Sequence, residues 1–450
     1  MKVMILNFKD KHVLVCGMAR SGQSAVKLLV EKGAKVCAQD LKAEINFSFD
    51  PEALGVTLHL GKGPEQIIDG FDLVIISPGI PFDLPYLNHA RALNIPVWGE
   101  LELAYRFCPC PIIGITGTNG KTTVTTLVGN IMKAFNPKTE VLGNIGSPFT
   151  DYVNSLDENS LAVAEVSSFQ LETIQEFAPF ISAVLNLTPD HLDRHKTMEI
   201  YKYTKERIFE NQGAEDFCIL NYDNLYCRNM NPPGKKIYFS ISERLKEGVF
   251  LENGVIKASL FDKEITIADV KFIKTLPENA LAAAAICLCG GAPPELVAEG
   301  LREFKGVPHR LEYIKTIKGI EFVNDSKATN IDAAVKGIEG IKSPIVLIGG
   351  GYDKGADFEP WVSCFDKKVR HFIIIGAVTE QLISTCEKTG YKDISCAETL
   401  EQAVNMAYKS AKHGDTVLLS PACASFDMFK DFEHRGDLFR EYVLALDNNS

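Results

Sequence analysis

The sequence of 450 residues contains no hydrophobic run long enough to cross a lipid bilayer. A transmembrane helix needs about 20 apolar residues, and the most apolar stretch, residues 280–289, is much shorter. The amino-terminal segment also lacks the apolar core of a signal peptide, because Asn7, Lys9 and Asp10 interrupt it. We therefore expect a cytoplasmic protein with no membrane partner, in which residues 280–289 form a buried helix.

Positive charge is not in excess either. The chain has 47 Lys and Arg residues against 58 Asp and Glu residues, a net charge of −11. Binding to nucleic acid depends on cationic contacts with phosphates, so we expect no nucleic-acid partner. A local basic pocket for a phosphate group remains compatible with this balance.

The twelve cysteines include no CxxC pair. Cys108 and Cys110 are spaced as CxC, as are Cys287 and Cys289. Cytoplasmic cysteines are reduced thiols, and free cysteine packs as a small apolar side chain. We therefore interpret these residues as parts of the core rather than as metal ligands.

Alternating strand and helix patterns predict an α/β fold. At about 150 residues per domain, the length is typical of three domains. In the first stretch we expect strands at residues 12–16, 35–38 and 73–76, and a helix at 24–31. This pattern predicts a doubly wound, Rossmann-like domain whose ligands bind at the carboxyl ends of the strands. Two prolines between Cys108 and Pro111 mark its boundary.

Two further α/β segments follow. In the second segment we expect strands at 112–116, 161–166 and 183–187, and a helix at 122–132. Residues 236–270 alternate between apolar and polar, with Asn253-Gly254 as a hairpin turn, which predicts a small antiparallel sheet attached to this domain. In the third segment we expect strands at 321–323, 345–348, 371–375 and 416–419. The expected domains are residues 1–108, 109–307 and 308–450.

A phosphate-binding loop is expected between residues 116 and 122. It reads Gly117, Thr118, Asn119, Gly120, Lys121, Thr122 and Thr123, after a strand and before a helix. Glycines let backbone N–H groups approach phosphate oxygens, and a helix N-terminus favours negative charge. Lys121 would contact terminal phosphates, and the Thr122 hydroxyl would face magnesium. Ile115 occupies the position of the first glycine in the strict motif.

The turn at residues 17–22 resembles a dinucleotide fingerprint, with Ala19 in place of the middle glycine. Asp40 ends the next strand, where an acidic residue would meet a ribose. Arg20 and Ser21 suit a diphosphate. A nucleotide site and a plain tight turn both remain open at this point.

Polar residues gather after several other strands. Glu165 ends one strand, and residues 186–194 place His191 between two aspartates, which makes a magnesium site near the phosphate loop plausible. Residues 324–330 are dense in polar side chains, residues 420–425 likewise follow a strand and carry a serine at each end, and Lys354 lies on a glycine-rich loop. Such loops are typical of binding sites, although solvated loops or helix caps would read similarly.

Together these motifs resemble the Mur ligase family, the ATP-dependent amide ligases of peptidoglycan precursor synthesis. The resemblance covers the whole chain and keeps the motifs in order: residues 117–122, Asp190-His-Leu-Asp193 and His309-Arg310. Residues 324–330 and 420–425 favour the branch that adds D-glutamate. The resemblance implies a monomeric enzyme with a P-loop-type central ATPase domain and Rossmann-like domains on either side. Its substrates would be ATP, D-glutamate and UDP-N-acetylmuramoyl-L-alanine, joined through an acyl phosphate.

The resemblance also implies roles for individual residues. Lys121, His191, Lys205 and Lys327 would be catalytic. Thr122, Glu165 and His191 would hold Mg²⁺, together with Lys205 if CO2 converts it to a carbamate. Besides residues 117–123, Asn279, Arg310 and Asp325 would contact ATP. The sugar-nucleotide substrate would meet Arg20, Ser21, Asp40, Ser77, Asn144 and Gln170, and D-glutamate would meet Thr329, Lys354, Ser425 and Phe432 as well as Lys327.

One departure from the family pattern concerns the nucleotide base. The family usually shows His-Asn where this chain has Thr275-Leu276, so one expected adenine contact is missing. Three alternatives are compatible with parts of the sequence: a related ligase that adds another amino acid or extends folate, a nicotinamide-dependent dehydrogenase, and a nucleotide-binding regulator. The dehydrogenase would not account for Lys121 or residues 324–330, and the regulator would not need Glu165 or Lys205.

Overall fold

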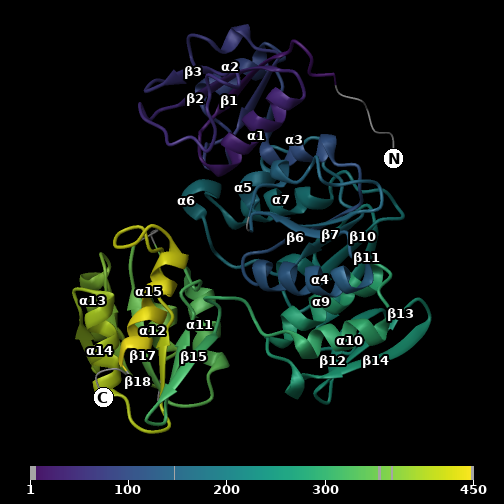
Figure 1. Cartoon of the computed structure of the whole chain (residues 1–450). Coiled ribbons are helices and arrows are strands. Elements are labelled where there is room, and N and C mark those ends of the chain that lie inside the picture. The colour runs from purple at the N-terminus through teal and green to yellow at the C-terminus, as the bar shows by residue number, and fades with distance from the viewer. Residues whose placement is uncertain (1–6, 146, 353–355, 366–367, 447–450) are drawn as a thin grey trace. The chain divides into compact units, whose positions relative to one another are not determined.

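The computed structural model describes residues 7–145, 147–352, 356–365 and 368–446. The chain divides into two compact units, one ending at Phe304 and the other beginning at Lys305. The first unit contains a five-stranded and a nine-stranded sheet, and the second contains a six-stranded sheet (Figure 1). All three sheets are covered by helices, as the alternating pattern predicts.

The five-stranded sheet is parallel throughout, with the order β3-β2-β1-β4-β5. Its strands are β1 His12–Cys16, β2 Lys35–Asp40, β3 Thr57–Leu60, β4 Leu73–Ile76 and β5 Val97–Gly99. Its helices are α1 Arg20–Glu31, α2 Pro85–Ala92 and α3 Glu100–Phe107, with a 3-10 turn, η1, at Ile68–Gly70. The strands expected near residues 12, 35 and 73 are confirmed, whereas β3 and β5 are short and gave no clear pattern.

Helix α1 begins one turn earlier than expected, at Arg20 rather than residue 24. The reason is the close approach of two glycines in the preceding turn. Gly17 has φ +86°, and a Cβ at Gly22 would lie 1.8 Å from the carbonyl oxygen of Gly17. The absence of side chains lets the first turn of the helix pack directly on the loop.

The nine-stranded sheet has the order β14-β13-β12-β11-β10-β9-β6-β8-β7. Its strands are β6 Ile112–Thr116, β7 Thr139–Gly143, β8 Leu161–Glu165, β9 Ile181–Val184, β10 Phe217–Asn221, β11 Lys235–Ser240, β12 Gly248–Glu252, β13 Val255–Leu260 and β14 Lys263–Asp269. The antiparallel strands expected in residues 236–270 are present, but they do not form a small sheet of their own attached to the domain. Only β12–β13 and β13–β14 are antiparallel, and β12 pairs parallel with β11, so these strands extend the central sheet. The Asn253-Gly254 turn is confirmed, with φ +52° and +77°.

Helices cover both faces and the carboxyl edge of the central sheet. They are α4 Lys121–Phe135, α5 Ser168–Leu171, α6 Leu192–His195, α7 Met198–Glu206, α8 Leu225–Arg228, α9 Pro277–Cys289 and α10 Pro294–Glu303, with 3-10 turns η2 Phe149–Asp151, η3 Arg207–Phe209 and η4 Val270–Phe272. Helices α4, α9 and α10 pack against one another (Figure 1). Residues 279–289 of α9 are all buried, which confirms the expected core helix.

The six-stranded sheet has the order β15-β16-β20-β17-β18-β19. Its strands are β15 Glu312–Ile317, β16 Ile320–Asn324, β17 Ile345–Gly350, β18 Val369–Ile375, β19 Ile394–Cys396 and β20 Thr416–Leu419. Its helices are α11 Ile331–Gly340, α12 Glu359–Ser363, α13 Thr379–Thr389, α14 Leu400–Ser410 and α15 Phe432–Ala445. Strand β15 runs antiparallel to β16, and the other pairs are parallel.

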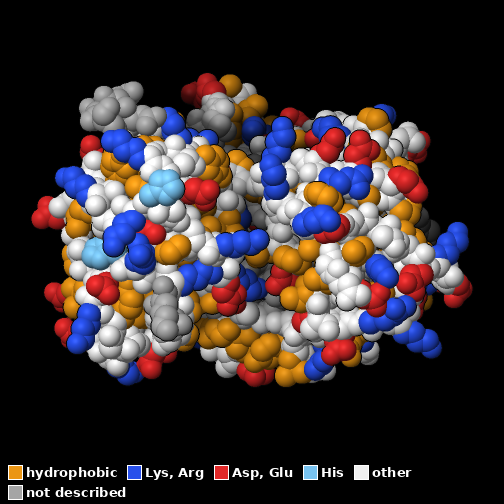
Figure 2. Space-filling model, turned by 90° about the horizontal axis from the view of Figure 1, so that it is seen from below, with side chains coloured by type: hydrophobic (Ala, Val, Ile, Leu, Met, Phe, Trp, Pro, Cys, Tyr) orange, Lys and Arg blue, Asp and Glu red, His pale blue; other side chains and the backbone are white. Residues whose placement is uncertain are grey.

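The cysteines and the charged side chains lie where the composition leads us to expect them. All twelve cysteines are free thiols, and ten of them are buried. Acidic and basic side chains are intermingled over the face shown in Figure 2. Across the described ranges, no helix is both long enough and apolar enough to span a membrane.

Two glutamates of helix α3, Glu100 and Glu102, hold this helix against the segment that follows it. Glu100 Oε1 accepts hydrogen bonds from the backbone N and Oγ1 of Thr150, at 2.7 and 2.9 Å. Its Oε2 is buried and has no partner among the described residues. Burial raises the pKa of Glu100 to about 7. Glu102, by contrast, accepts on both oxygens from the backbone N–H groups of residues 175–177 and from Arg106.

We expect the Glu100→Gln variant to gain stability at high pH and not at low pH. A carboxyl group whose pKa is raised on folding costs no stability below its unfolded pKa of 4.5, and the full cost is reached above the folded value of about 7. The uncharged amide removes that cost, a gain of about 2–3 kcal/mol at pH 8 relative to pH 4.5. Urea unfolding at both pH values measures the difference.

Glu102→Gln is the matched comparison on the same helix. An amide nitrogen there would face backbone N–H donors, so we expect a loss of about 3 kcal/mol at both pH values. A gain from Glu100→Gln that did not depend on pH would contradict the explanation given for that residue.

Candidate active site

The phosphate loop lies between β6 and α4, as the motif predicts. Gly117 has φ +152° and Gly120 has φ +83°, conformations that side chains with a Cβ rarely adopt. Thr122 and Thr123 are buried in the first turn of α4. The N–H groups in the first turn of a helix and the helix dipole together favour an anion at this position.

Asn186 fixes the loop from the neighbouring strand and was not among the predicted site residues. Its Oδ1 accepts from the backbone N of Asn119 at 2.8 Å, and its Nδ2 donates to the carbonyl of the same residue at 3.0 Å. Its own carbonyl accepts from Thr118 N at 3.0 Å. The available signal was its place directly after a strand, at the start of the polar stretch 186–194.

Two lysines lie at the loop. Lys121 Nζ donates to the carbonyls of Gly117 and Thr118, at 2.9 and 2.8 Å. Lys205, on α7, is 1% exposed, and its Nζ donates to Thr116 Oγ1 at 3.2 Å. Burial, followed by the charge of Lys121, holds the pKa of Lys205 well below its usual value. The environment therefore favours the neutral amine of Lys205.

Glu165 ends β8, the strand next to β6 in the sheet. Its Oε1 accepts from Asn144 Nδ2 at 2.8 Å. Its Oε2 is buried and has no hydrogen-bond partner among the described residues. A buried carboxylate oxygen without a partner is costly, so this atom suits a cation or a ligand donor.

His191 stands at the start of α6 with φ +53°. Its Nε2 lies 3.7 Å from Asp190 Oδ2, and the ring of Phe169 packs edge-on against its imidazole at 4.9 Å. His195, one turn later, is buried and its Nε2 lies 3.0 Å from Ser168 Oγ. Burial lowers the pKa of His195 to about 4, which favours the neutral ring.

The predicted sugar-nucleotide residues lie at the carboxyl end of the five-stranded sheet, with two more near Glu165. Ser77 Oγ donates to the Gly17 carbonyl at 2.7 Å, and Asp40 accepts from the backbone N of Met18 and Lys42. Arg20 is exposed and Ser21 half-buried. Asn144 is beside Glu165, whereas the Gln170 amide closes a capping box with Ser167.

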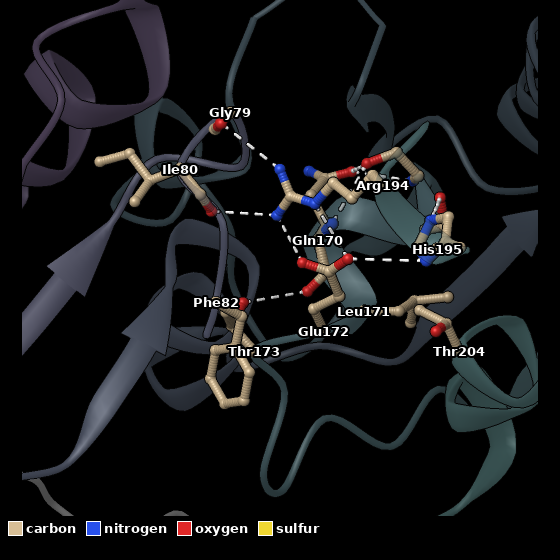
Figure 3. A network of polar contacts seen from close by, with 12 residues as sticks. Gly79, Ile80, Phe82, Gln170, Leu171, Glu172, Thr173, Arg194, His195 and Thr204 are labelled. Carbon is tan, nitrogen blue, oxygen red and sulfur yellow. Dashed lines mark hydrogen bonds and ion pairs between the residues drawn. The ribbon is translucent and has the colours of Figure 1, made fainter. Parts of the chain in front are cut away.

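Arg194 joins these two regions (Figure 3). Its guanidinium pairs with Glu172 and also donates to the carbonyls of Gly79 and Ile80, at 3.3 and 3.0 Å. The loop that follows β4 is therefore held against the segment that carries His191.

Asn279, at the start of α9, borders the phosphate loop. A Cβ at Gly120 would lie 2.5 Å from Asn279 Oδ1. Asn279 Nδ2 donates to Thr275 Oγ1 at 3.4 Å. Thr275, one of the two residues that depart from the family pattern, therefore lies next to the predicted ATP residue Asn279.

In the second unit, the predicted loops follow three adjacent strands, β16, β20 and β17. Asp325 is fully buried, accepts from Ser420 Oγ at 3.0 Å and lies 3.7 Å from the guanidinium of Arg310. Burial raises the pKa of Asp325 to about 6, against the opposing effect of Arg310. The two predicted ATP residues of this unit are thus an ion pair.

Two of the predicted D-glutamate residues of this unit, Lys327 and Phe432, are in contact. Lys327 Nζ lies 4.8 Å from the centre of the Phe432 ring, and the backbone N of Thr329 donates to the Lys327 carbonyl. Ser425 is buried, in the loop after β20. Lys354 lies outside the described residues.

Arg435, on α15, supports these loops and was not predicted. It is fully buried and donates to Ser326 Oγ and to the carbonyls of Ser326, Cys423 and Ala424. Burial lowers its pKa to about 10.

Comparison with known proteins shows the family to which the chain belongs. Three family models match the chain: "Mur ligase MurD-like, N-terminal domain" at residues 11–99, "Mur ligase middle domain" at 115–287 and "Mur ligase, glutamate ligase domain" at 309–423. The chain belongs to the Mur ligase family. This family accounts for the phosphate loop and the third-segment loops, which the dehydrogenase alternative left unexplained.

Curated Mur ligases match over the full length. The UDP-N-acetylmuramoylalanine--D-glutamate ligase of Alkaliphilus oremlandii is 47% identical, over 98% of this chain and 100% of the relative. The enzyme of the same name from Lachnoclostridium phytofermentans is 42% identical, over 98% and 99%.

Solved Mur ligase structures share the fold. MurC from Thermotoga maritima has a TM-score of 0.60 at 17% identity, and covers 97% of this chain and 99% of its own. MurF from the same organism, in complex with ADP, has a TM-score of 0.58 at 15% identity, with 97% and 96% covered. The three-domain α/β fold class is therefore confirmed.

We expect the Asn186→Ala variant to bind ADP about 10- to 100-fold more weakly, because the backbone N and O of Asn119 lose their partners and the loop loses its fixed shape. Asn136→Ala, at the other end of α4, removes comparable backbone contacts far from the loop and should leave the affinity unchanged. Calorimetric titration with ADP measures both, and equal affinities for the two variants would contradict the role of Asn186.

Proposed function

We propose that this chain is an ATP-dependent amide ligase that adds D-glutamate to UDP-N-acetylmuramoyl-L-alanine in cytoplasmic peptidoglycan precursor synthesis. The observation that carries the proposal is the full-length similarity, at 42–47% identity, to relatives with the name of that ligase. The folded phosphate loop and the polar loops of the second unit supply the local chemistry that such a reaction needs.

The reaction proceeds through an acyl phosphate. The terminal carboxylate of the sugar nucleotide takes the γ-phosphoryl group of ATP, and ADP leaves. The D-glutamate amine then attacks the acyl carbon, loses a proton, and phosphate departs. The loop N–H groups and Lys121 hold the phosphates in line, and this positioning, together with neutralisation of charge, lowers the barrier.

Mg²⁺ fits the residues at the loop. The donors would be Thr122, Glu165, His191 and a carbamate on Lys205, and the unpartnered Glu165 Oε2 supports this assignment. When bound, Mg²⁺ would neutralise charge on the phosphate oxygens. Asn144 orients the Glu165 carboxylate by its hydrogen bond to Oε1, whereas Asp190 and Phe169 fix the imidazole of His191.

The environment of Lys205 supports its carbamylation. A neutral amine attacks CO2, a new N–C bond forms, and one proton is released. Burial and the charge of Lys121 favour that neutral form. The resulting anion would lie near Thr116 and near the charges of Lys121, Asp190 and Glu165, so the Lys121 ammonium and a bound cation would together offset the added negative charge.

We assign substrate binding as the sequence predicts. Arg20, Ser21, Asp40, Ser77, Asn144 and Gln170 would meet the sugar nucleotide, and Asn279, Arg310 and Asp325 would meet ATP. Lys327, Thr329, Lys354, Ser425 and Phe432 would meet D-glutamate, whose two carboxylates suit cations and hydroxyl donors. We propose domain boundaries at residues 108 and 307, and a monomer in solution.

The decisive experiment measures phosphate release from ATP in the presence of UDP-N-acetylmuramoyl-L-alanine and Mg²⁺. Phosphate should appear with D-glutamate and not with L-glutamate, L-lysine or no amino acid. Phosphate release in the absence of the sugar nucleotide would indicate an ATPase. Release with another amino acid would keep the mechanism but overturn the assignment of the D-glutamate loops.

We expect Lys205→Ala to lose at least about 100-fold in kcat, with partial recovery on addition of short carboxylic acids, because these can occupy the position of the carbamate. Lys202→Ala, on the same helix, removes only a pairing with Glu206 and should retain activity. Full activity of Lys205→Ala would remove the carbamate from the mechanism.

A further inference from the structure

The surroundings of Arg194 match the planar shape of its guanidinium group. Its Nε donates to Glu172 Oε1 at 3.0 Å, and its Nη2 donates to Glu172 Oε2. The side chains are 14% and 15% exposed. The guanidinium also lies over the ring of Phe169, 4.3 Å from its centre. A two-point pairing in a largely buried position fixes the orientation of the guanidinium as well as its distance from the carboxylate.

The other side of the guanidinium reaches the loop after β4. Nη1 donates to the Gly79 carbonyl and Nη2 to the Ile80 carbonyl (Figure 3). The same loop begins at Ser77, whose hydroxyl donates to Gly17 in the fingerprint turn. A movement of Gly79 and Ile80 would therefore be transmitted to the turn that is expected to bind the diphosphate.

Arg194 is equally tied to His191. The two residues share the single turn of α6, where the backbone N of Arg194 donates to the His191 carbonyl at 3.1 Å. Phe169 packs against both the imidazole and the guanidinium. The carboxylate of Glu172 is paired with the guanidinium of Arg194.

We propose that Arg194 is a positioning residue of the ligation reaction. It fixes the loop of the sugar-nucleotide site relative to His191, and thereby sets where the acceptor carboxylate meets the phosphate of ATP. This inference rests on the proposed function, because it concerns the alignment of those two substrates. A displacement of about 1 Å between reacting groups lowers the rate by about 100-fold, so a single inter-segment clamp has a large effect.

The test compares the steady-state kinetics of Arg194→Met with those of the unaltered chain. We expect kcat/KM for the sugar nucleotide to fall at least about tenfold, with KM for D-glutamate within about twofold. Arg194→Lys keeps the positive charge but lacks the planar guanidinium, so it should recover only part of the kcat/KM that Arg194→Met loses. Glu172→Gln should produce the same pattern, and the double variant should lose no more than the worse single variant, because both changes break one clamp.

Arg302→Met, at an exposed position of α10, is the matched control and should match the unaltered chain. Hydrogen exchange provides a second measurement: the amides of residues 77–80 should exchange faster in Arg194→Met, with little change elsewhere. A loss shared equally by all three substrates and proportional to the unfolded fraction would overturn the proposal, as would unchanged kinetics. Failure of the proposed function itself would show separately, as no D-glutamate-dependent turnover in the unaltered chain.

Discussion

The active-site region depends on one constraint, the alignment of parallel strand ends in the central sheet. Because β6 lies between β8 and β9, the phosphate loop, Glu165 and the segment from Asn186 to His191 all begin at the same edge. Residues 70 positions apart in the chain, such as Thr118 and Thr188, are thereby within hydrogen-bonding distance. Asn186, which follows the neighbouring strand β9, fixes the shape of the phosphate loop by its hydrogen bonds to Asn119.

This proximity has an electrostatic consequence. Lys121 and Lys205 face the same small volume, and with two ammonium ions there the buried one would be poorly solvated. The neutral form of Lys205, which burial and Lys121 favour, would relieve this repulsion. The same crowding supports the proposal that Lys121 binds phosphate and that Lys205 is the lysine that is modified.

The sequence was most informative where a local rule determines the structure. Residues 12–16, 73–76, 112–116 and 416–419 were expected as strands and are strands with those same bounds, because buried parallel strands are continuous apolar runs. The continuation of β11 into β12 was missed, since pairing partners depend on tertiary contacts and the hairpin pattern alone suggested a separate sheet. Asn186, Arg194 and Arg435 were also missed as site residues. Their roles depend on backbone carbonyls and N–H groups that the fold brings near them, and a sequence motif does not record those.

Arg435 also joins helix α15 to two loops that precede it in the chain. The loops at residues 326 and 423–424 come from separate strands, and their carbonyls converge on a guanidinium supplied by α15, the last described helix. The carbonyls of Ser326, Cys423 and Ala424 thus share one hydrogen-bond donor. The shape of the two loops therefore depends on a side chain that follows both of them in the sequence. Arg435, which we do not place among the substrate contacts, thus helps to shape loops for which we propose a role in binding the amino acid.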